Sequence, residues 1–283
     1  MSSGLIILLF TFAFQCFASL SDPFPGGYSM GNLGTIICKN NASGMQPWTP
    51  ASQADQTPGW GVSVGAISYY SKGDNLSGKS IYKVIGGGWY NTAFMSLKMS
   101  ISQLDALGIY YEQSLFCSAG KQFFSLLDIS IEAWVHKSGL HSDSNQSHTI
   151  GEIGGSIRVP LNVVSLTFAI EHCVIKRSST YGVNPPLTIK TGVHTKLNKF
   201  GAQGVLLEIT PDYTKPIRLI IGEEIRILKW LGIHGAIGNN PVMIGIGLVV
   251  DWRNFDVNTA LVNHTVLGWS KGFSASFKRL SQK

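Results

Sequence analysis

The eight residues Met95–Ser102, MSLKMSIS, alternate without exception between apolar and polar side chains. Met95, Leu97, Met99 and Ile101 share one parity. The other parity carries Ser96, Lys98, Ser100 and Ser102. Successive side chains of a β-strand point to opposite faces. The segment therefore predicts a strand that separates an apolar medium from a wet one.

The same period of two recurs along the chain. Turn-forming residues such as Lys72–Asn75 and Gly238–Pro241 separate the alternating runs. We expect about fourteen strands of about 9 to 15 residues between Gly59 and Leu280, a length that suits tilted strands in a bilayer. Among the apolar faces are Leu127, Ile129, Ile131 and Val135; Val164, Leu166, Phe168 and Ile170; Leu187, Ile189 and Val193; Ile244, Ile246, Leu248 and Val250; and Trp269, Phe273 and Phe277.

A closed barrel in a membrane explains this pattern better than a soluble protein. The predicted connections are very short, and the faces opposite the apolar ones are rich in Ser, Gly, Thr and charge. Only 13% of the residues are charged, about half the share typical of soluble globular proteins. Aromatic residues near strand ends match the interfacial girdles of membrane barrels: Trp60, Trp252, Trp269 and Phe277. We therefore predict an all-β fold, a transmembrane antiparallel β-barrel of about 14 strands.

The alternative is a secreted soluble β-sandwich that acts as a lectin-like binding module. Sandwich strands also alternate between apolar and polar faces. Four Asn-x-Ser/Thr triplets fit glycosylation of a secreted protein, although such triplets also arise by chance in a chain rich in Ser and Asn. They begin at Asn41, Asn75, Asn145 and Asn263.

The N-terminus carries the pattern of a secretory signal. Leu5–Phe14 is a continuous apolar run, and the small residues Ala18 and Ser19 follow it. The run is short for a membrane anchor, which is the other interpretation. We expect a signal peptide at 1–20, an N-terminal segment at 21–58 that could plug the barrel, and the transmembrane barrel at 59–283. Export and a membrane-spanning barrel together predict that the protein is located in the bacterial outer membrane.

Charge and cysteine content point to no other partner class. The net charge of +6 is scattered and forms no basic run, so nucleic acid is not an expected partner. Cleavage of the signal would leave Cys38, Cys117 and Cys173, an odd number without metal-like spacing. One pair of these could oxidise after export, and the sequence does not say which.

Two charged residues break the alternation. Glu223 falls on the apolar parity of its segment, between Ile221 and Ile225. Either a bulge shifts the register there, or Glu223 lies near the membrane edge. Lys271 interrupts the apolar parity near the chain's end in the same way, and its long side chain could reach the interface.

Two segments are similar to a known family. The first contains MGNLGT (30–35), NNASGM (40–45) and WTPA (48–51). The second spans 217–277 and contains RLIIGEE, LGIHGAIG, IGIGLVVD, FDVNTALVNHTVLGWS and FSASF. They resemble the N-terminal segment and the final hairpins of the long-chain fatty acid transporter (FadL) superfamily and its PorV-like relatives. Thr49 stands where that family has the Asn of an "NPA" motif, and six residues follow Phe277, where such barrels usually end.

The resemblance implies a fourteen-stranded barrel with an N-terminal segment near or inside the lumen. It also implies passage or binding of a small, hydrophobic ligand. An envelope structural role is the other function that we consider for such a barrel.

No motif in the chain carries catalytic chemistry. There is no G-x-S-x-G, H-E-x-x-H, Walker loop or C-x-x-C in the sequence. The seven histidines are dispersed; His136, His172 and His194 are expected in the lumen or at strand ends, and metal sites need clustered ligands. We predict no enzyme activity, no cofactor and no metal site. Gly86–Gly88 lies inside a strand pattern, where it lets the chain bend or approach another element.

The polar parity of the strands predicts the lining of a wet lumen. A barrel of this strand number is wide enough for small solutes unless a segment plugs it. The expected partners are the lipid bilayer, a small hydrophobic ligand and the barrel-assembly machinery. The residues expected to line the lumen are Ser96, Lys98, Asp128, Glu132, Lys190, Glu224 and Arg226.

Overall fold

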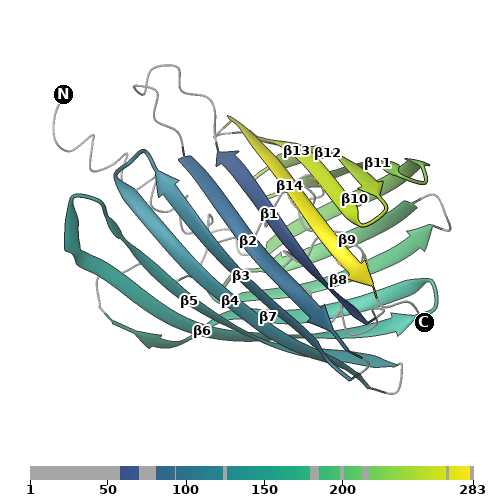
Figure 1. Ribbon diagram of the computed structural model, residues 1–283, viewed down its shortest axis with the longest axis horizontal. Coiled ribbons are helices and arrows are strands. Elements are labelled where there is room, and N and C mark those ends of the chain that lie inside the picture. The colour runs from purple at the N-terminus through teal and green to yellow at the C-terminus, as the bar shows by residue number, and fades with distance from the viewer. Residues whose placement is uncertain are drawn as a thin grey trace.

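The computed structural model describes residues 58–69, 81–92, 94–123, 126–178, 185–197, 201–211, 217–265 and 268–280. They form fourteen strands (Figure 1). No helix among these residues is long and apolar enough to cross a membrane. The strands are β1 (Gly59–Tyr69), β2 (Ile81–Asn91), β3 (Ser96–Ala106), β4 (Tyr110–Phe123), β5 (Leu127–Leu140), β6 (Asp143–Leu161), β7 (Val164–Arg177), β8 (Thr188–Leu197), β9 (Gly201–Ile209), β10 (Ile217–Leu228), β11 (Leu231–Gly238), β12 (Met243–Trp252), β13 (Phe255–His264) and β14 (Gly268–Leu280).

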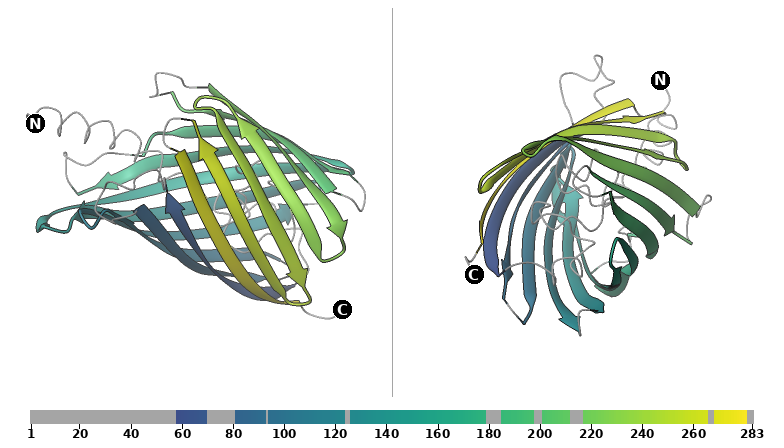
Figure 2. Two further views of the ribbon diagram at one scale, coloured as in Figure 1. Left: turned by 90° about the horizontal axis from the view of Figure 1, so that it is seen from above. Right: turned by 90° about the vertical axis from the view of Figure 1, so that its right-hand side faces the viewer.

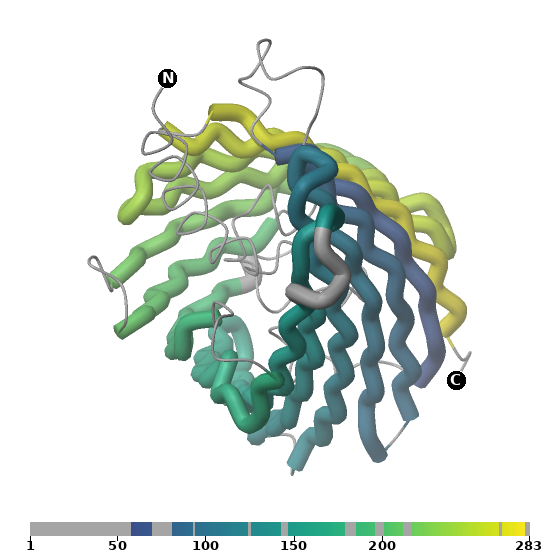
Figure 3. Tube along the Cα trace, turned by 90° about the vertical axis from the view of Figure 1, so that its left-hand side faces the viewer, coloured from purple at the N-terminus to yellow at the C-terminus, as the bar shows by residue number. Residues whose placement is uncertain are grey.

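The strands make one closed antiparallel sheet in chain order. Each strand pairs with its sequence neighbours, and β14 pairs back onto β1 from Gly59↔Leu280 to Ser68↔Lys271. Figures 2 and 3 show this single layer of strands around a common interior. The predicted fourteen-stranded barrel is confirmed, and closure of one sheet rules out the two-layered sandwich. Two strands fall outside the expected lengths: β6 has 19 residues and β11 has 8.

The two ends of the barrel have different connections. The end where β1 begins and β14 finishes, here the terminal end, has short connections, of which 92–95 is the longest. The opposite end, here the distal end, carries the longer connections 70–80, 178–187 and 210–216. Outer-membrane barrels show the same asymmetry, with short turns on the periplasmic side. The predicted signal peptide and nearly all of the 21–58 segment lie outside the described residues.

The outer face of the barrel is apolar. Each of the fourteen strands exposes at least one large apolar side chain. In β3, for example, Leu97, Met99 and Ile101 are exposed while Ser96 and Lys98 are buried, as the alternation predicts. A continuous apolar surface of this extent is unfavourable in water and favourable in lipid. The barrel therefore has the surface of a protein that spans a bilayer.

Exposed aromatic side chains gather near the terminal end. Trp60 is the second residue of β1, Tyr90 the last but one of β2 and Trp252 the last of β12, and all three are exposed. The ring of Phe277 lies 5.7 Å from that of Trp60 and 5.0 Å from that of Phe255. Aromatic rings of this kind occupy the interfaces between lipid and water. Trp269, the second residue of β14, is exposed toward the distal end.

The inner face has a polar and an apolar sector. Polar side chains dominate inside β4–β8. Toward the distal end, apolar side chains from β1, β3, β9, β10, β12 and β13 pack into one buried cluster. The cluster consists of Ile67, Tyr69, Leu104, Ala106, Leu206, Ile220, Met243, Ala260 and Val262. Its presence means that the interior is not uniformly wet, which the alternation alone did not predict.

The two charged residues that break the alternation lie on the outer face. The β9–β10 register runs unbroken from Ile217 to Ile225, and Glu223 sits in the middle of β10. No bulge precedes Glu223, so that interpretation was wrong, and a place near the membrane edge stays a prediction. Its Oε1 accepts a hydrogen bond of 3.2 Å from the exposed Gln203. Lys271 is exposed three residues into β14, near the distal end, where its side chain can reach the interface.

Candidate functional site

The seven residues predicted to line the lumen share the inner side of the wall. Arg226 is half-buried and the others are buried. Lys98 and Lys190 both lie within electrostatic range of Glu132. The other four belong to separate groups on different strands, so the seven do not form one site. Their placement fits the predicted lining, while a wet, open lumen stays a prediction.

One group is a buried ion pair between directly opposed residues. Asp128 on β5 faces Arg158 on β6, and Arg158 Nε donates to Asp128 Oδ2 at 2.6 Å. Both side chains are at most 3% exposed. Asp128 is one of the predicted lining residues and Arg158 is not, because the partner depends on the register between strands.

A second group lies on β10 and β12. Arg226 donates to Glu224 Oε1 at 2.6 Å and also to Asp251 Oδ2. The positive guanidinium thus bridges two carboxylates, so each of the three charges has an oppositely charged neighbour inside the barrel. Asp251 was not among the predicted lining residues.

A third group runs across β7–β10. Lys190 Nζ lies 2.9 Å from Glu171 Oε2 and 3.9 Å from Glu208 Oε2. Arg218 Nη1 lies 3.7 Å from Glu208 Oε1. Charges of both signs therefore alternate around this part of the inner wall.

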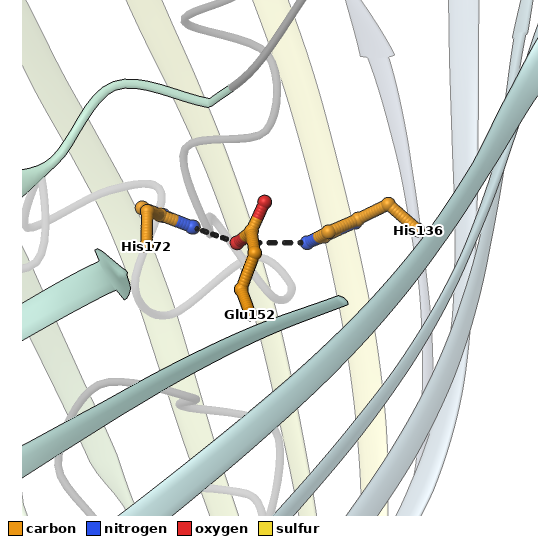
Figure 4. Close-up of side chains that lie close together, drawn as sticks. All are labelled: His136, Glu152 and His172. Atoms are coloured by element: carbon orange, nitrogen blue, oxygen red, sulfur yellow. Dashed lines mark hydrogen bonds and ion pairs between the residues drawn. The ribbon is translucent and has the colours of Figure 1, made fainter. Parts of the chain in front are cut away.

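Beside this group, three side chains from consecutive strands meet at one point (Figure 4). His136 on β5 and His172 on β7 approach Glu152 on β6 from opposite sides. His172 Nδ1 lies 2.6 Å from Glu152 Oε2, and His136 Nε2 lies 3.4 Å from the same oxygen. We call these three residues the His–Glu–His cluster. All three are buried.

An irregularity in β7 brings His172 into this cluster. Ile153 pairs with Cys173 and Gly155 with Ile170, so two residues of β7 are left over between these pairs. These residues, Glu171 and His172, are adjacent and both buried. His172 has a φ of 62°, in the left-handed region that non-glycine residues seldom adopt. Strict alternation would have placed His172 on the outer face, and the β-bulge turns it inward.

The outer face of β1–β6 contains a large hollow. Its volume is about 1120 Å³, and its border includes the exposed Trp60, Met99 and Ile131. Lys98 and Glu132, which are buried on the inner side, also border it. The hollow thus touches residues from both sides of the wall.

Glycines of β2 contribute to the hollow. Gly86 and Gly88 share the parity of the exposed Val84 and Tyr90 and border the hollow. A Cβ at Gly86 would meet no atom within 4 Å. The two glycines leave open space at this point of the outer face, whereas the neighbouring strands carry Val, Leu, Met and Ile there.

Of the cysteines, Cys117 is exposed and Cys173 is half-buried, and both are free. Cys38 lies outside the described residues. Cys117 borders the hollow on β4.

Comparisons with known proteins support the fold. No family model and no curated protein matches the chain. The chain is similar in structure to the CymD monoaromatic hydrocarbon channel, with a TM-score of 0.67, 11% identity, and coverage of 91% of this chain and 98% of that one. It is also similar to the Acinetobacter baumannii outer membrane protein Omp33, with a TM-score of 0.50, 11% identity, and coverage of 79% and 100%. At such identities the likeness shows a shared barrel fold, and membership of the fatty acid transporter superfamily stays a prediction.

Proposed function

We propose that this chain is an outer-membrane barrel that binds small apolar molecules and passes them across the outer membrane. The observation that carries the proposal is the hollow in the wall of β1–β6, which is mainly apolar and is bordered by residues of both faces. An apolar solute dissolved in the membrane could enter the wall there. The polar residues Lys98 and Glu132 lie where such a route would reach the interior.

The apolar cluster inside the barrel supports the same ligand class. General porins keep a polar, water-filled lumen. Here Leu104, Leu206 and Ile220 are about 1% exposed inside the barrel, in a place that favours apolar contacts over water. The structural neighbour described as a monoaromatic hydrocarbon channel suggests an aromatic hydrocarbon as the first probe.

The proposal includes a location and an orientation. The signal peptide at 1–20 would export the chain, and the barrel-assembly machinery would insert it into the outer membrane. The short connections of the terminal end would face the periplasm, and the longer distal connections would face outward. The segment 21–58 would lie near or in the lumen.

The test is uptake of radiolabelled toluene by outer-membrane-bearing cells that express the full chain. We expect faster uptake than in cells without the chain, and loss of most of that gain in Gly86→Phe/Ala133→Phe, which fills the hollow. The matched control is Ala66→Phe/Thr259→Phe, which places the same two phenyl rings on the outer face elsewhere. Heat-modifiable gel migration verifies that each variant is folded. Equal uptake with and without the chain would overturn the proposal, as would a large, toluene-independent conductance for ions in liposomes.

A further inference from the structure

We propose that the His–Glu–His cluster of His136, Glu152 and His172 binds a divalent transition-metal ion of the Zn²⁺ type. One donor atom from each residue lies within 4.8 Å of those of the other two. Figure 4 shows both imidazole rings directed at the carboxylate between them. Two imidazoles and one carboxylate are a common protein ligand set for zinc, with a fourth position left for water or another ligand.

The hydrogen bonds around His136 prepare its Nε2 for a metal. Ser114 Oγ donates to Glu112 Oε1 at 3.2 Å. His136 Nδ1 lies 2.7 Å from Ser114 Oγ, and in the tautomer that carries its proton on Nδ1 this nitrogen donates while the hydroxyl hydrogen stays with Glu112. In the neutral ring, Nε2 then carries a lone pair toward Glu152. A histidine ligand that donates its other N–H to a hydrogen-bonded acceptor is typical of metal centres.

Two buried atoms of the cluster are left without ordinary partners. His136 Nε2 and Glu152 Oε1 have no hydrogen-bond partner among the described residues. In the tautomer with its proton on Nδ1, the lone pair of His136 Nε2 faces Glu152 Oε2, 3.4 Å away, as a second acceptor. A cation between them removes this conflict, and burial of the unpaired acceptors otherwise costs free energy.

The surroundings favour a cation over an anion. Glu112 Oε1 lies 3.8 Å from His136 Nδ1, and Glu171 Oε2 lies 4.0 Å from His172 Nε2. The nearby positive charge of Lys190 is engaged by Glu171 at 2.9 Å. Imidazole nitrogens select Zn²⁺, Cu²⁺ or Ni²⁺ over Ca²⁺ and Mg²⁺, which prefer all-oxygen ligands.

A metal at this point would join three consecutive strands. His136, Glu152 and His172 belong to β5, β6 and β7, and the register between β6 and β7 is interrupted beside the cluster. The ion would hold the bulged strand in place from inside the barrel. This inference concerns the inner wall and does not depend on the proposed transport through the hollow.

The test uses the full chain without an affinity tag, refolded in detergent after chelator treatment and then titrated with ZnCl₂. We expect one Zn²⁺ per chain by calorimetry and elemental analysis, undiminished by excess Mg²⁺ or Ca²⁺. Loss of a ligand in Glu152→Gln or His172→Gln should weaken binding more than 100-fold. Ser114→Ala, which removes only the group that orients His136, should weaken it about 10–100-fold. His234→Gln, a buried histidine on β11, is the matched control and should bind as the wild type does.

Electron paramagnetic resonance of the Cu²⁺-loaded wild-type chain provides a readout that needs no variant to fold. Two coupled imidazole nitrogens are expected in its spectrum. No stoichiometric Zn²⁺, equal affinity in the wild type and Glu152→Gln, or fewer than two coupled nitrogens would each overturn the proposal and identify a cluster held by hydrogen bonds alone.

Discussion

Glu223 and Glu224 are adjacent in β10 and lie on opposite sides of the barrel wall. Glu223 is exposed on the apolar outer face, where Gln203 donates to it. Glu224 is 3% exposed inside, where Arg226 donates to it at 2.6 Å. A carboxylate therefore faces an apolar surface at position 223 and a positively charged partner at position 224.

Replacing each carboxylate by leucine should separate these consequences. Glu223→Leu removes a charge from the lipid-facing surface and should raise the free energy of unfolding by up to about 2 kcal/mol, since charges on that surface are unfavourable to a degree that depends on depth. Glu224→Leu removes a partner of Arg226 and should lower it by about 1.5–3 kcal/mol. Urea unfolding from phospholipid vesicles measures both. Equal signs for the two variants would contradict the assignment of faces.

The Asp128–Arg158 pair predicts strong non-additivity. Asp128→Leu or Arg158→Met alone leaves one buried charge without its main partner, at a cost of about 3–5 kcal/mol. The double variant removes both charges and should cost much less than the sum of the single changes. The same unfolding assay provides the four values of the cycle. Additive effects would show that the two groups act independently.

The outward position of Cys117 can be tested by chemical labelling. With the other three cysteines changed to serine, a lipid-soluble maleimide should label Cys117 in vesicles, whereas a charged, membrane-impermeant maleimide should not. The reaction is followed over hours. A cysteine at Thr92, in a terminal-end turn, is the control that the charged reagent should label. Rapid labelling of Cys117 by the charged reagent would contradict a lipid-facing β4.

The fold was predictable because the barrel repeats one rule. In Met95–Ser102 the medium on each side of the wall determines whether each residue is apolar or polar, and Ser96 and Lys98 are buried as that rule requires. The same rule yields the strand number. It holds wherever a strand keeps its register with its neighbours.

The sites were less predictable because they depend on cross-strand register and on local departures from it. Arg158 is the partner of Asp128 only because β5 and β6 pair in one particular register. His172 reaches Glu152 through a bulge that alternation does not encode. One signal was present: Ala169 and Glu171 continue the inner parity, and a second polar residue, His172, follows directly. Two adjacent polar residues late in an alternating run can indicate such a bulge.

Two glycines on neighbouring strands allow a last prediction about the wall itself. A Cβ at Gly61 on β1 would lie 2.6 Å from Nε1 of Trp89, whose ring covers this glycine from the paired position on β2. A Cβ at Gly86 would meet nothing within 4 Å. Gly61→Ala must displace the indole ring and should lower the free energy of unfolding by about 1–3 kcal/mol, as overpacking does. Gly86→Ala lowers the conformational entropy of the unfolded chain and introduces no clash in the folded barrel. It should leave the free energy of unfolding unchanged or raise it by up to about 1 kcal/mol. Unfolding in vesicles, together with the shift of tryptophan emission expected only for Gly61→Ala, distinguishes the two. If both variants were equally destabilised, the close packing of Trp89 on Gly61 and the open space at Gly86 would be wrong.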